Sequence, residues 1–521
     1  MNMWGMNVRR WMAAALMVVS VVAAAAPAQA EWREARAKHF ILYGNMSDGD
    51  IRAMATRLEQ FDAVLRYIYR LPELDGQESN PVTVYAVADV AAVRRLYGKG
   101  RDDVAGFYQP RVSGSVAFTP LRGNAGDPNA LQPQQVLFHE YAHHFLFGNT
   151  SSAYPAWFSE GFAEFTGTAQ FERTGVMVGV AAQHRAYGLL MANKLPIDTL
   201  FDSSRRKLDG LELDQVYGRG WLLTHMAMFD NDQRAKLTTY FRLLNTGTPS
   251  IEAGNKAFGS LKELDRDLDR YLRRGKIPGT LVPFDRLGTP TIAVRVLSPG
   301  EQSLIGYRMQ SDRGVDNKSG RALYARAASV APSYPQDAVA QGWFAEMAYD
   351  AGEEAVAEAA VDRALAIDPR SQQALLYKGM IHLRRAQAAK STDAKVWEEA
   401  RSWIVKANRV DPNAAEPLAT FYGSFLMQGE KPRPSAVVGL DRAFQLVPQD
   451  AGLRFLLVTQ RIKDEKFDEA KVLLRPLAFD PHMPADNPAA KMLAVLEKGD
   501  RDAIRTLVEP KADTSVAATA P

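Results

Sequence analysis

The chain has 521 residues, a length that usually divides into two or three domains because one hydrophobic core rarely organises so many. Its composition, 46% hydrophobic and 24% charged, is that of an ordinary globular protein. A formal charge of +3 indicates neither a nucleic acid nor an anionic membrane as the main partner. The sequence contains no cysteine, which excludes disulfides and thiolate ligands, so any metal site must use histidine and carboxylate side chains.

Residues 1–30 have the pattern of a signal peptide. Arg9 and Arg10 precede the apolar run Trp11–Ala26, and Ala28-Gln29-Ala30 is a small-x-small cleavage site. The apolar run of 16 residues is shorter than the roughly 20 that a transmembrane helix needs. We therefore expect a periplasmic or secreted protein with no stable membrane span after cleavage. An uncleaved membrane anchor is the alternative.

Residues 31–276 predict an α+β domain. Strand-like stretches at His39–Tyr43, Val82–Val87 and Ser115–Thr119 alternate with helical patterns. A helix is then expected from Pro133 to Phe147, and a second one, opened by Pro155, carries Trp157–Phe165, so that the two form a helical hairpin. Further helices are expected at Val180–Ala192, Asp214–Phe229, Arg234–Leu244 and Leu261–Arg274.

The second half of the chain repeats itself. After a boundary segment, 277–320, in which Ile292–Leu297 is the clearest strand, the prolines Pro332, Pro369, Pro412, Pro448 and Pro481 are 37, 43, 36 and 33 residues apart. Alanine-rich helix ends precede most of them. This pattern resembles the tetratricopeptide repeat and implies an all-α solenoid over 321–485, with a generic helical bundle as the alternative. A capping helix within 486–510 and a disordered tail, 511–521, complete the expected order.

The clearest chemical motif is His139-Glu140-Tyr141-Ala142-His143. Residues four apart lie one turn above each other on a helix, so both imidazoles can face one metal ion. Glu140, next to the first ligand, can then reach a metal-bound water as a general base. This set of side chains suits zinc.

A second motif, Trp157 to Glu164, places Glu160 17 residues after His143, on the return helix of the hairpin. Two histidines and one glutamate leave one position open for water, which is typical of a catalytic zinc site. Glu164 lies one turn further on the same face, where it can accept the other ring N–H of a ligating histidine. A solvated helix face is the alternative for both glutamates, but they lie in an apolar, aromatic run where unpaired charges are costly.

Together, the motifs from His139 to His143 and from Ser159 to Glu164 resemble the gluzincin peptidases, especially their aminopeptidase-like branch. The resemblance implies a thermolysin-like (zincin) catalytic domain, Zn²⁺ on His139, His143 and Glu160, and Glu140 as base. The Gly-x-Met-Glu-Asn segment with which those aminopeptidases hold a free amine is missing here, so exopeptidase action has no support.

The resemblance also implies a donor for the oxyanion on a later helix. Tyr217 and His225 both fall in Asp214–Phe229, and we favour Tyr217, with a packed core tyrosine as the alternative. His225 is interpreted as a core histidine. His144 points about 100° away from the second ligand on the helix and is left off the metal. Residues 112–119 are a candidate sheet edge for strand addition by a peptide.

The leading hypothesis is an exported zinc peptidase whose repeats recruit a substrate or a partner protein. The alternative is a catalytically silent periplasmic scaffold that acts through its repeats. Intact ligands and an intact base favour the enzyme, because Glu140 could be lost without harm to the fold. A purely structural zinc domain would need a fourth protein ligand, which the motifs do not supply.

Overall fold

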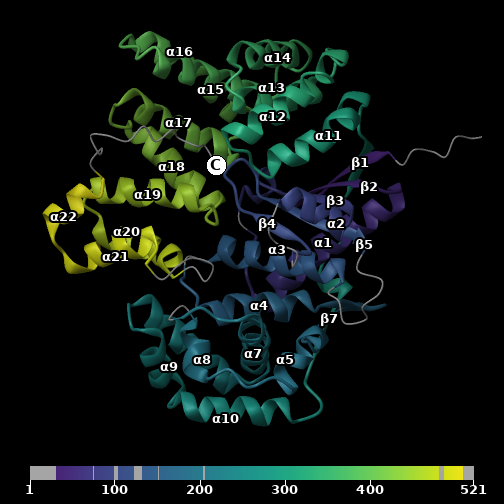
Figure 1. Cartoon of the computed structure of the whole chain (residues 1–521), viewed down its shortest axis with the longest axis vertical. Coiled ribbons are helices and arrows are strands. Elements are labelled where there is room, and N and C mark those ends of the chain that lie inside the picture. Colours follow the sequence, from purple (N-terminus) through teal and green to yellow (C-terminus); the bar gives the residue numbers. More distant parts are fainter. Residues whose placement is uncertain are drawn as a thin grey trace, which may run out of the picture.

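We analysed a computed structural model of the chain (Figure 1), which describes residues 31–73, 75–98, 104–122, 132–150, 152–203, 206–479 and 486–508. The N-terminal part mixes strands and helices, and the C-terminal part is built from helices. The predicted signal peptide, 1–30, and tail, 511–521, lie outside the described residues. Among the described residues, no helix is both long and apolar enough to cross a membrane.

The central sheet has six strands in the order β4-β5-β3-β2-β1-β9. Their bounds are β1 Trp32–Arg36, β2 Phe40–Asn45, β3 Val82–Asp89, β4 Phe107–Gln109, β5 Val116–Arg122 and β9 Ala293–Val296. β2, β3 and β5 run parallel, whereas β1, β4 and β9 each pair antiparallel with a neighbour. The three strand-like stretches of the sequence thus form the middle of the sheet, and β9 closes one edge from the predicted boundary segment.

The prediction that residues 112–119 form the sheet edge is wrong. β5 is an inner strand, because Phe107 pairs with Phe118 and Gln109 with Val116 across β4 and β5. The edge at this end of the sheet is β4, which is too short to show a strand pattern in the sequence. A chain that added to the sheet here would therefore meet β4 rather than β5.

Helices cover both faces of this sheet. Side chains of a strand alternate between faces, and on β3 Val84 and Ala86 join a core with the helices α1 and α3, while Tyr85 and Val87 join a second core with C-terminal helices. α1 spans Asp48–Tyr69, capped by Ser47, and α2 spans Val90–Tyr97. The nearly continuous apolar run of β3 is consistent with a strand buried on both faces.

Below the sheet lies a helical layer built around α4, Ala156–Gly167, and α7, Gly210–Phe229. The expected helical hairpin is present, with α3 at Pro133–Asn149 leading into α4. The other helices of this layer are α5 Ala186–Leu190, α6 Ile197–Phe201, α8 Asn231–Asn245, α9 Ser250–Phe258 and α10 Leu261–Leu272. A small antiparallel sheet of β6 Gln170–Phe171, β7 Gly175–Val178 and β8 Thr280–Pro283 lies beside them.

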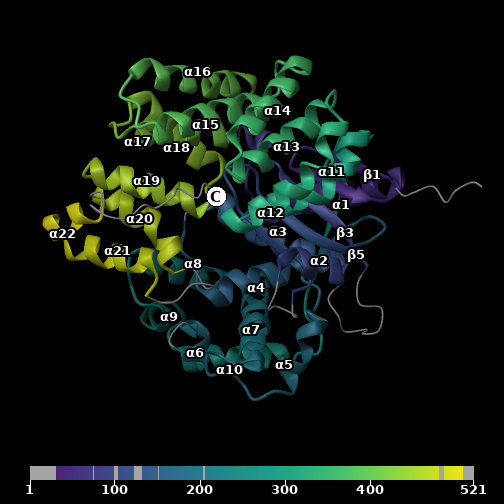
Figure 2. The ribbon, with the colours of Figure 1, turned by 45° about the horizontal axis from the view of Figure 1, so that its top comes forward.

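The C-terminal helices follow one another in an arc around the N-terminal part (Figures 1 and 2). They are α11 Pro299–Asp312, α12 Asn317–Ala327, α13 Ala338–Asp350, α14 Glu354–Ile367, α15 Gln372–Ala388, α16 Ala394–Val410, α17 Ala415–Gln428, α18 Pro434–Leu446, α19 Ala451–Lys463, α20 Phe467–Ala478, α21 Pro488–Lys498 and α22 Arg501–Thr506. Pro369, Pro412 and Pro448 each follow a helix end closely, as the repeat pattern predicts.

Two boundaries differ from the expected ones. α11 lies inside the segment 277–320, in which one or two strands but no helix had been assigned, and it packs on the sheet through Leu304 and Ile305. The helix expected after Ala489 is split in two, because the chain adopts a left-handed conformation at Gly499 between α21 and α22.

Candidate metal centre

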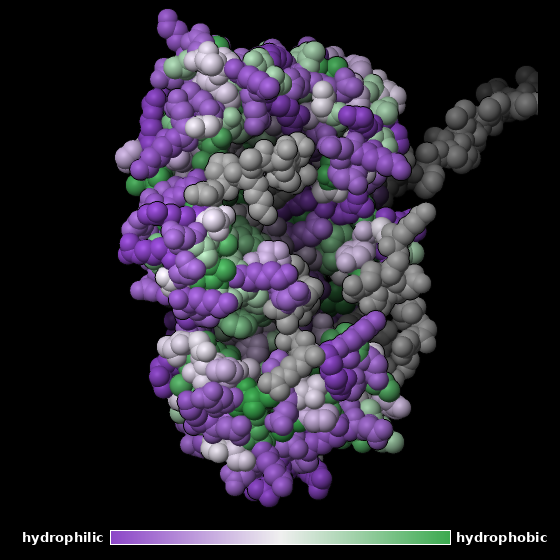
Figure 3. Space-filling model, turned by 60° about the vertical axis from the view of Figure 1, so that its left-hand side comes forward, coloured by the Kyte–Doolittle hydropathy of each residue, from purple (hydrophilic) through white to green (hydrophobic). Residues whose placement is uncertain are grey.

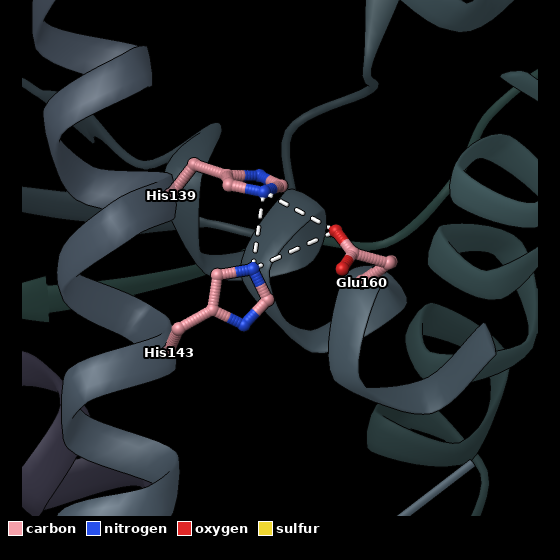
Figure 4. Close-up of side chains that lie close together, drawn as sticks. All are labelled: His139, His143 and Glu160. Atoms are coloured by element: carbon pink, nitrogen blue, oxygen red, sulfur yellow. Dashed lines mark hydrogen bonds and ion pairs between the residues drawn. The ribbon is translucent and has the colours of Figure 1, made fainter. Parts of the chain in front are cut away.

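His139, His143 and Glu160 converge on one point between two helices (Figure 4). Both histidines project from α3, one turn apart, and Glu160 projects toward them from α4. The Nε2 atoms of the two rings are 3.3 Å apart, and the Glu160 Oε2 lies 3.4 Å from His139 Nε2 and 3.6 Å from His143 Nε2.

These distances fit a tetrahedral metal ion. Donor atoms that bind zinc at about 2.0–2.1 Å in a tetrahedron lie about 3.3–3.4 Å from one another. The three separations of the site fall within about 0.3 Å of that value, and the donors are of the types that zinc prefers. With three protein ligands, the fourth position is left for water or substrate.

The outer nitrogen of each ring faces a polar side chain. His139 Nδ1 lies 3.5 Å from Glu164 Oε1, and His143 Nδ1 lies 3.4 Å from Ser159 Oγ. Such partners fix which ring nitrogen is left for a metal, and here that is Nε2 on both rings. The sequence pointed to Glu164 in this place but not to Ser159.

Glu164 itself is held by two side chains that the sequence motifs did not indicate. His184 Nε2 lies 2.7 Å from Glu164 Oε2, and Arg185 Nη2 donates to Glu164 Oε1 at 2.6 Å. Arg185 also donates to Asp214 Oδ1 at 2.6 Å, which ties the metal helices to α7. The only sequence signal for these partners is indirect, because a buried carboxylate such as Glu164 requires a nearby positive charge.

These contacts shift the pKa values of Glu164 and His139. Burial acts to raise the pKa of Glu164, but the hydrogen bond with His184 and the charge of Arg185 outweigh it and lower the pKa to about 2. Burial acts to lower the pKa of His139, yet the hydrogen bond with Glu160 and the charge of Glu164 raise it to about 9. A metal ion that binds His139 would therefore have to compete with a proton.

A cavity of about 220 Å³ opens beside His139. Glu140 and Tyr217 both line it. Its remaining walls come from Val104, Ala105 and Gly106 before β4, from Gln135, Val136 and His139 on α3, from Ala163, Glu164, Gly167 and Thr168 at α4, and from His184 and Arg185. The proposed base and the proposed oxyanion donor thus share one cavity with a metal ligand.

Tyr217 stacks against His139, with ring centroids 6.1 Å apart and planes 14° from parallel. The Arg185 guanidinium lies 4.7 Å from the centre of the Tyr217 ring on α7. Burial, followed by the charge of Glu160, raises the pKa of Tyr217 above its ordinary value, so the hydroxyl keeps its proton at neutral pH. A tyrosine in this position can donate a hydrogen bond to a developing oxyanion.

His225 and His144 lie away from the cluster of His139, His143 and Glu160. His225 is fully buried, with Nδ1 2.8 Å from Tyr271 Oη and Nε2 3.0 Å from the Gly179 carbonyl oxygen, as expected for a core histidine. His144 lies on another side of α3, where its Nδ1 is 2.7 Å from Tyr108 Oη.

A comparison of the chain with known protein-family models and with curated proteins found no match.

Proposed function

We propose that the protein is a zinc-dependent peptidase of the gluzincin type, with a thermolysin-like N-terminal region and a tetratricopeptide-like C-terminal arc. The observation that carries the proposal is the convergence of His139, His143 and Glu160 at tetrahedral spacing, with Glu140 in the adjoining cavity. Two histidines and one glutamate with one open position are the ligand set of a catalytic rather than a structural zinc.

The zinc ion and the residues of the chain would each supply part of the hydrolytic chemistry. When bound, zinc supplies a Lewis acid that polarises a carbonyl oxygen and lowers the pKa of a water molecule toward about 7. Glu140 takes the proton from the attacking water and passes it to the leaving amine. Tyr217 donates its hydroxyl proton in a hydrogen bond to the oxyanion, a contribution worth about 10²–10³ in rate for such donors.

An extended peptide fits this site by lying along β4. Val104, Ala105 and Gly106 line the cavity and lead directly into β4, which is the edge strand at this end of the sheet. Strand addition there would align the peptide backbone with the metal centre and leave its side chains to select among sequences.

Glu140→Gln tests the proposal against the scaffold alternative. We expect the variant to lose about 10²–10⁴-fold of a chelator-sensitive hydrolysis of casein while its zinc content and melting temperature stay those of the wild type. Glu172→Gln, on the exposed turn between β6 and β7, is the matched control and should keep full activity. Equal hydrolysis by Glu140→Gln would contradict the proposed mechanism, and zinc binding without any hydrolysis by the wild type would favour the scaffold.

A further inference from the structure

The hairpin formed by β4 and β5 belongs to the N-terminal part, and its turn contacts the inner side of the helical arc through Val112 and Ser115. Its turn, residues 110–115, is tight, with a hydrogen bond from Gly114 N–H to the Arg111 carbonyl oxygen at 3.2 Å and a left-handed conformation at Gly114. The hairpin therefore connects the edge strand β4, beside the proposed metal centre, to the inner surface of the arc.

Arg111, at the tip of the hairpin, lies against the arc. Its guanidinium lies against the backbone of Gly314, so closely that a Cβ on that glycine would be 2.2 Å from Arg111 Nη2. Burial raises the pKa of Asp312, Asp350, Glu416 and Asp450, and the positive charge of Arg111 acts against this shift. These four acids come from α11, α13, α17 and the start of α19, so Arg111 complements acidic groups along most of the arc.

The next residue adds an apolar contact. Val112 packs against the core shared by α17 to α21. Asp450 is 2% exposed and caps α19 by accepting from Leu453 N–H at 2.6 Å. The tip of the hairpin thus covers part of the inner surface of the arc, the kind of surface through which solenoid repeats bind their ligands.

The base of the turn links the arc to the metal helix. Ser115 Oγ accepts from Tyr108 Oη at 3.0 Å and from Gln449 Nε2, in the loop before α19, at 3.4 Å. Tyr108 Oη also lies 2.7 Å from Nδ1 of His144, the residue after the ligand His143. At the other end of β4, a Cβ on Gly106 would be 2.4 Å from Val136 Cγ1 of α3, so the strand is packed tightly against the metal helix there as well.

We infer that the repeat arc binds the chain's own β4–β5 hairpin and, through it, holds the edge strand β4 in the position that receives an extended peptide beside the metal. Arg111 and Val112 are positioning residues in this arrangement. The inference rests on the proposed function, because it gives the repeats a role at the same site. The inner surface of the arc then binds a segment of the same chain instead of a recruited partner protein.

The experiment compares Arg111→Glu and Arg111→Lys with Arg95→Glu, an equal charge change at an exposed position on α2. Hydrogen exchange of residues 107–118 is measured on the full-length, metal-free chain. Binding of two probes to the zinc-loaded chain is then measured by calorimetry. A peptide hydroxamate contacts both the metal and the edge strand, whereas acetohydroxamate contacts the metal alone. Val112→Ser replaces Arg111→Glu if near-ultraviolet circular dichroism shows that the latter is unfolded.

We expect Arg111→Glu to speed exchange across 107–118 and to weaken the peptide hydroxamate at least about tenfold, because a mobile edge strand is no longer preorganised for binding. Acetohydroxamate affinity should change by less than about twofold. Arg111→Lys should restore most of the loss, and Arg95→Glu should match the wild type. Unchanged exchange in Arg111→Glu, or faster exchange with unchanged peptide-hydroxamate affinity, would overturn the inference. Failure of the wild type to bind either hydroxamate would instead overturn the proposed metal site.

Discussion

Glu164 lies between His139, a proposed metal ligand, and the side chains of His184 and Arg185. Its carboxylate is 3% exposed and meets His184 and Arg185 at hydrogen-bonding distance. The cost of burying a charge is recovered only while both partners stay in place. Loss of the charge on Glu164 should therefore affect both the position of His139 and the stability of the helical layer. The effect on stability can be measured as a function of pH.

The stability of the metal-free protein should fall in acid because of this residue. The pKa of Glu164 is about 2 in the folded protein and about 4.5 without its partners, so its contribution is present above pH 4.5 and is lost as the pH falls toward 2. Between pH 6 and pH 3 the loss is on the order of 2 kcal/mol. Urea denaturation at both pH values should show this difference in the wild type and a smaller one in Glu164→Gln. An equal pH dependence in the two proteins would contradict the assignment, and Glu172→Gln should behave as the wild type.

At the scale of elements, α4 and α7 cross with almost no side chain between them. A Cβ on Gly161 would lie 2.3 Å from the Gly220 carbonyl oxygen, and a Cβ on Gly220 would lie 2.1 Å from the Trp157 carbonyl oxygen. This close approach brings Tyr217 of α7 to the cavity that Glu164 of α4 also lines. The proposed site therefore keeps its shape only while residues 161 and 220 have no Cβ atom.

Gly220→Ala should therefore separate the two helices. We expect a loss of about 1–3 kcal/mol in the free energy of unfolding, typical of overpacking, together with weaker zinc binding because Glu160 shifts away from the histidines. Gly210→Ala, at the first position of α7 with open space around it, is the control and should be neutral or slightly stabilising. Denaturant titration and a chelator competition measure the two effects. Wild-type stability in Gly220→Ala would show that the helices do not touch here.

The helices α3 and α4 and the inner strands of the sheet could be predicted from the sequence, because each is marked by a pattern of neighbouring residues. Helical spacing places His139 and His143 on one face, and the apolar run at Val82–Val87 marks a buried strand. The contribution of His184 and Arg185 could not be predicted, since no periodicity relates them to Glu164. The pairing of β9 with β1 joins Arg33 to Val296, a contact between distant segments that no local pattern encodes.

At the scale of the whole molecule, the two parts share a core instead of meeting through a linker. Tyr43, Tyr85 and Phe118 of the sheet are at most 8% exposed because C-terminal helices cover them. Trp343 of α13 packs edge-on against Tyr43, with ring centroids 6.4 Å apart, and Asp312 of α11 hydrogen bonds to the Tyr85 hydroxyl. Further along the arc, Ala415 N–H donates to Asn80 Oδ1 at 3.0 Å.

A fragment of residues 31–298, which ends before α11, should consequently fail to fold as a monomer. It would expose the aromatic face of the sheet to water, and exposed apolar patches of this kind drive association. We expect aggregates in size-exclusion chromatography and a weak near-ultraviolet circular dichroism signal, whereas the chain from residue 31 to residue 508 is monodisperse. A soluble fragment with native-like circular dichroism would show that the N-terminal part is independent of the arc.

The central claim is that His139, His143 and Glu160 bind one zinc ion. Elemental analysis of the purified mature protein after dialysis, beside Glu160→Ala and the control Glu172→Ala, tests it most directly. We expect one zinc per chain in the wild type and in the control, and a metal content near zero in Glu160→Ala. No zinc in the wild type after incubation with the ion, or an equal zinc content in Glu160→Ala, would contradict it.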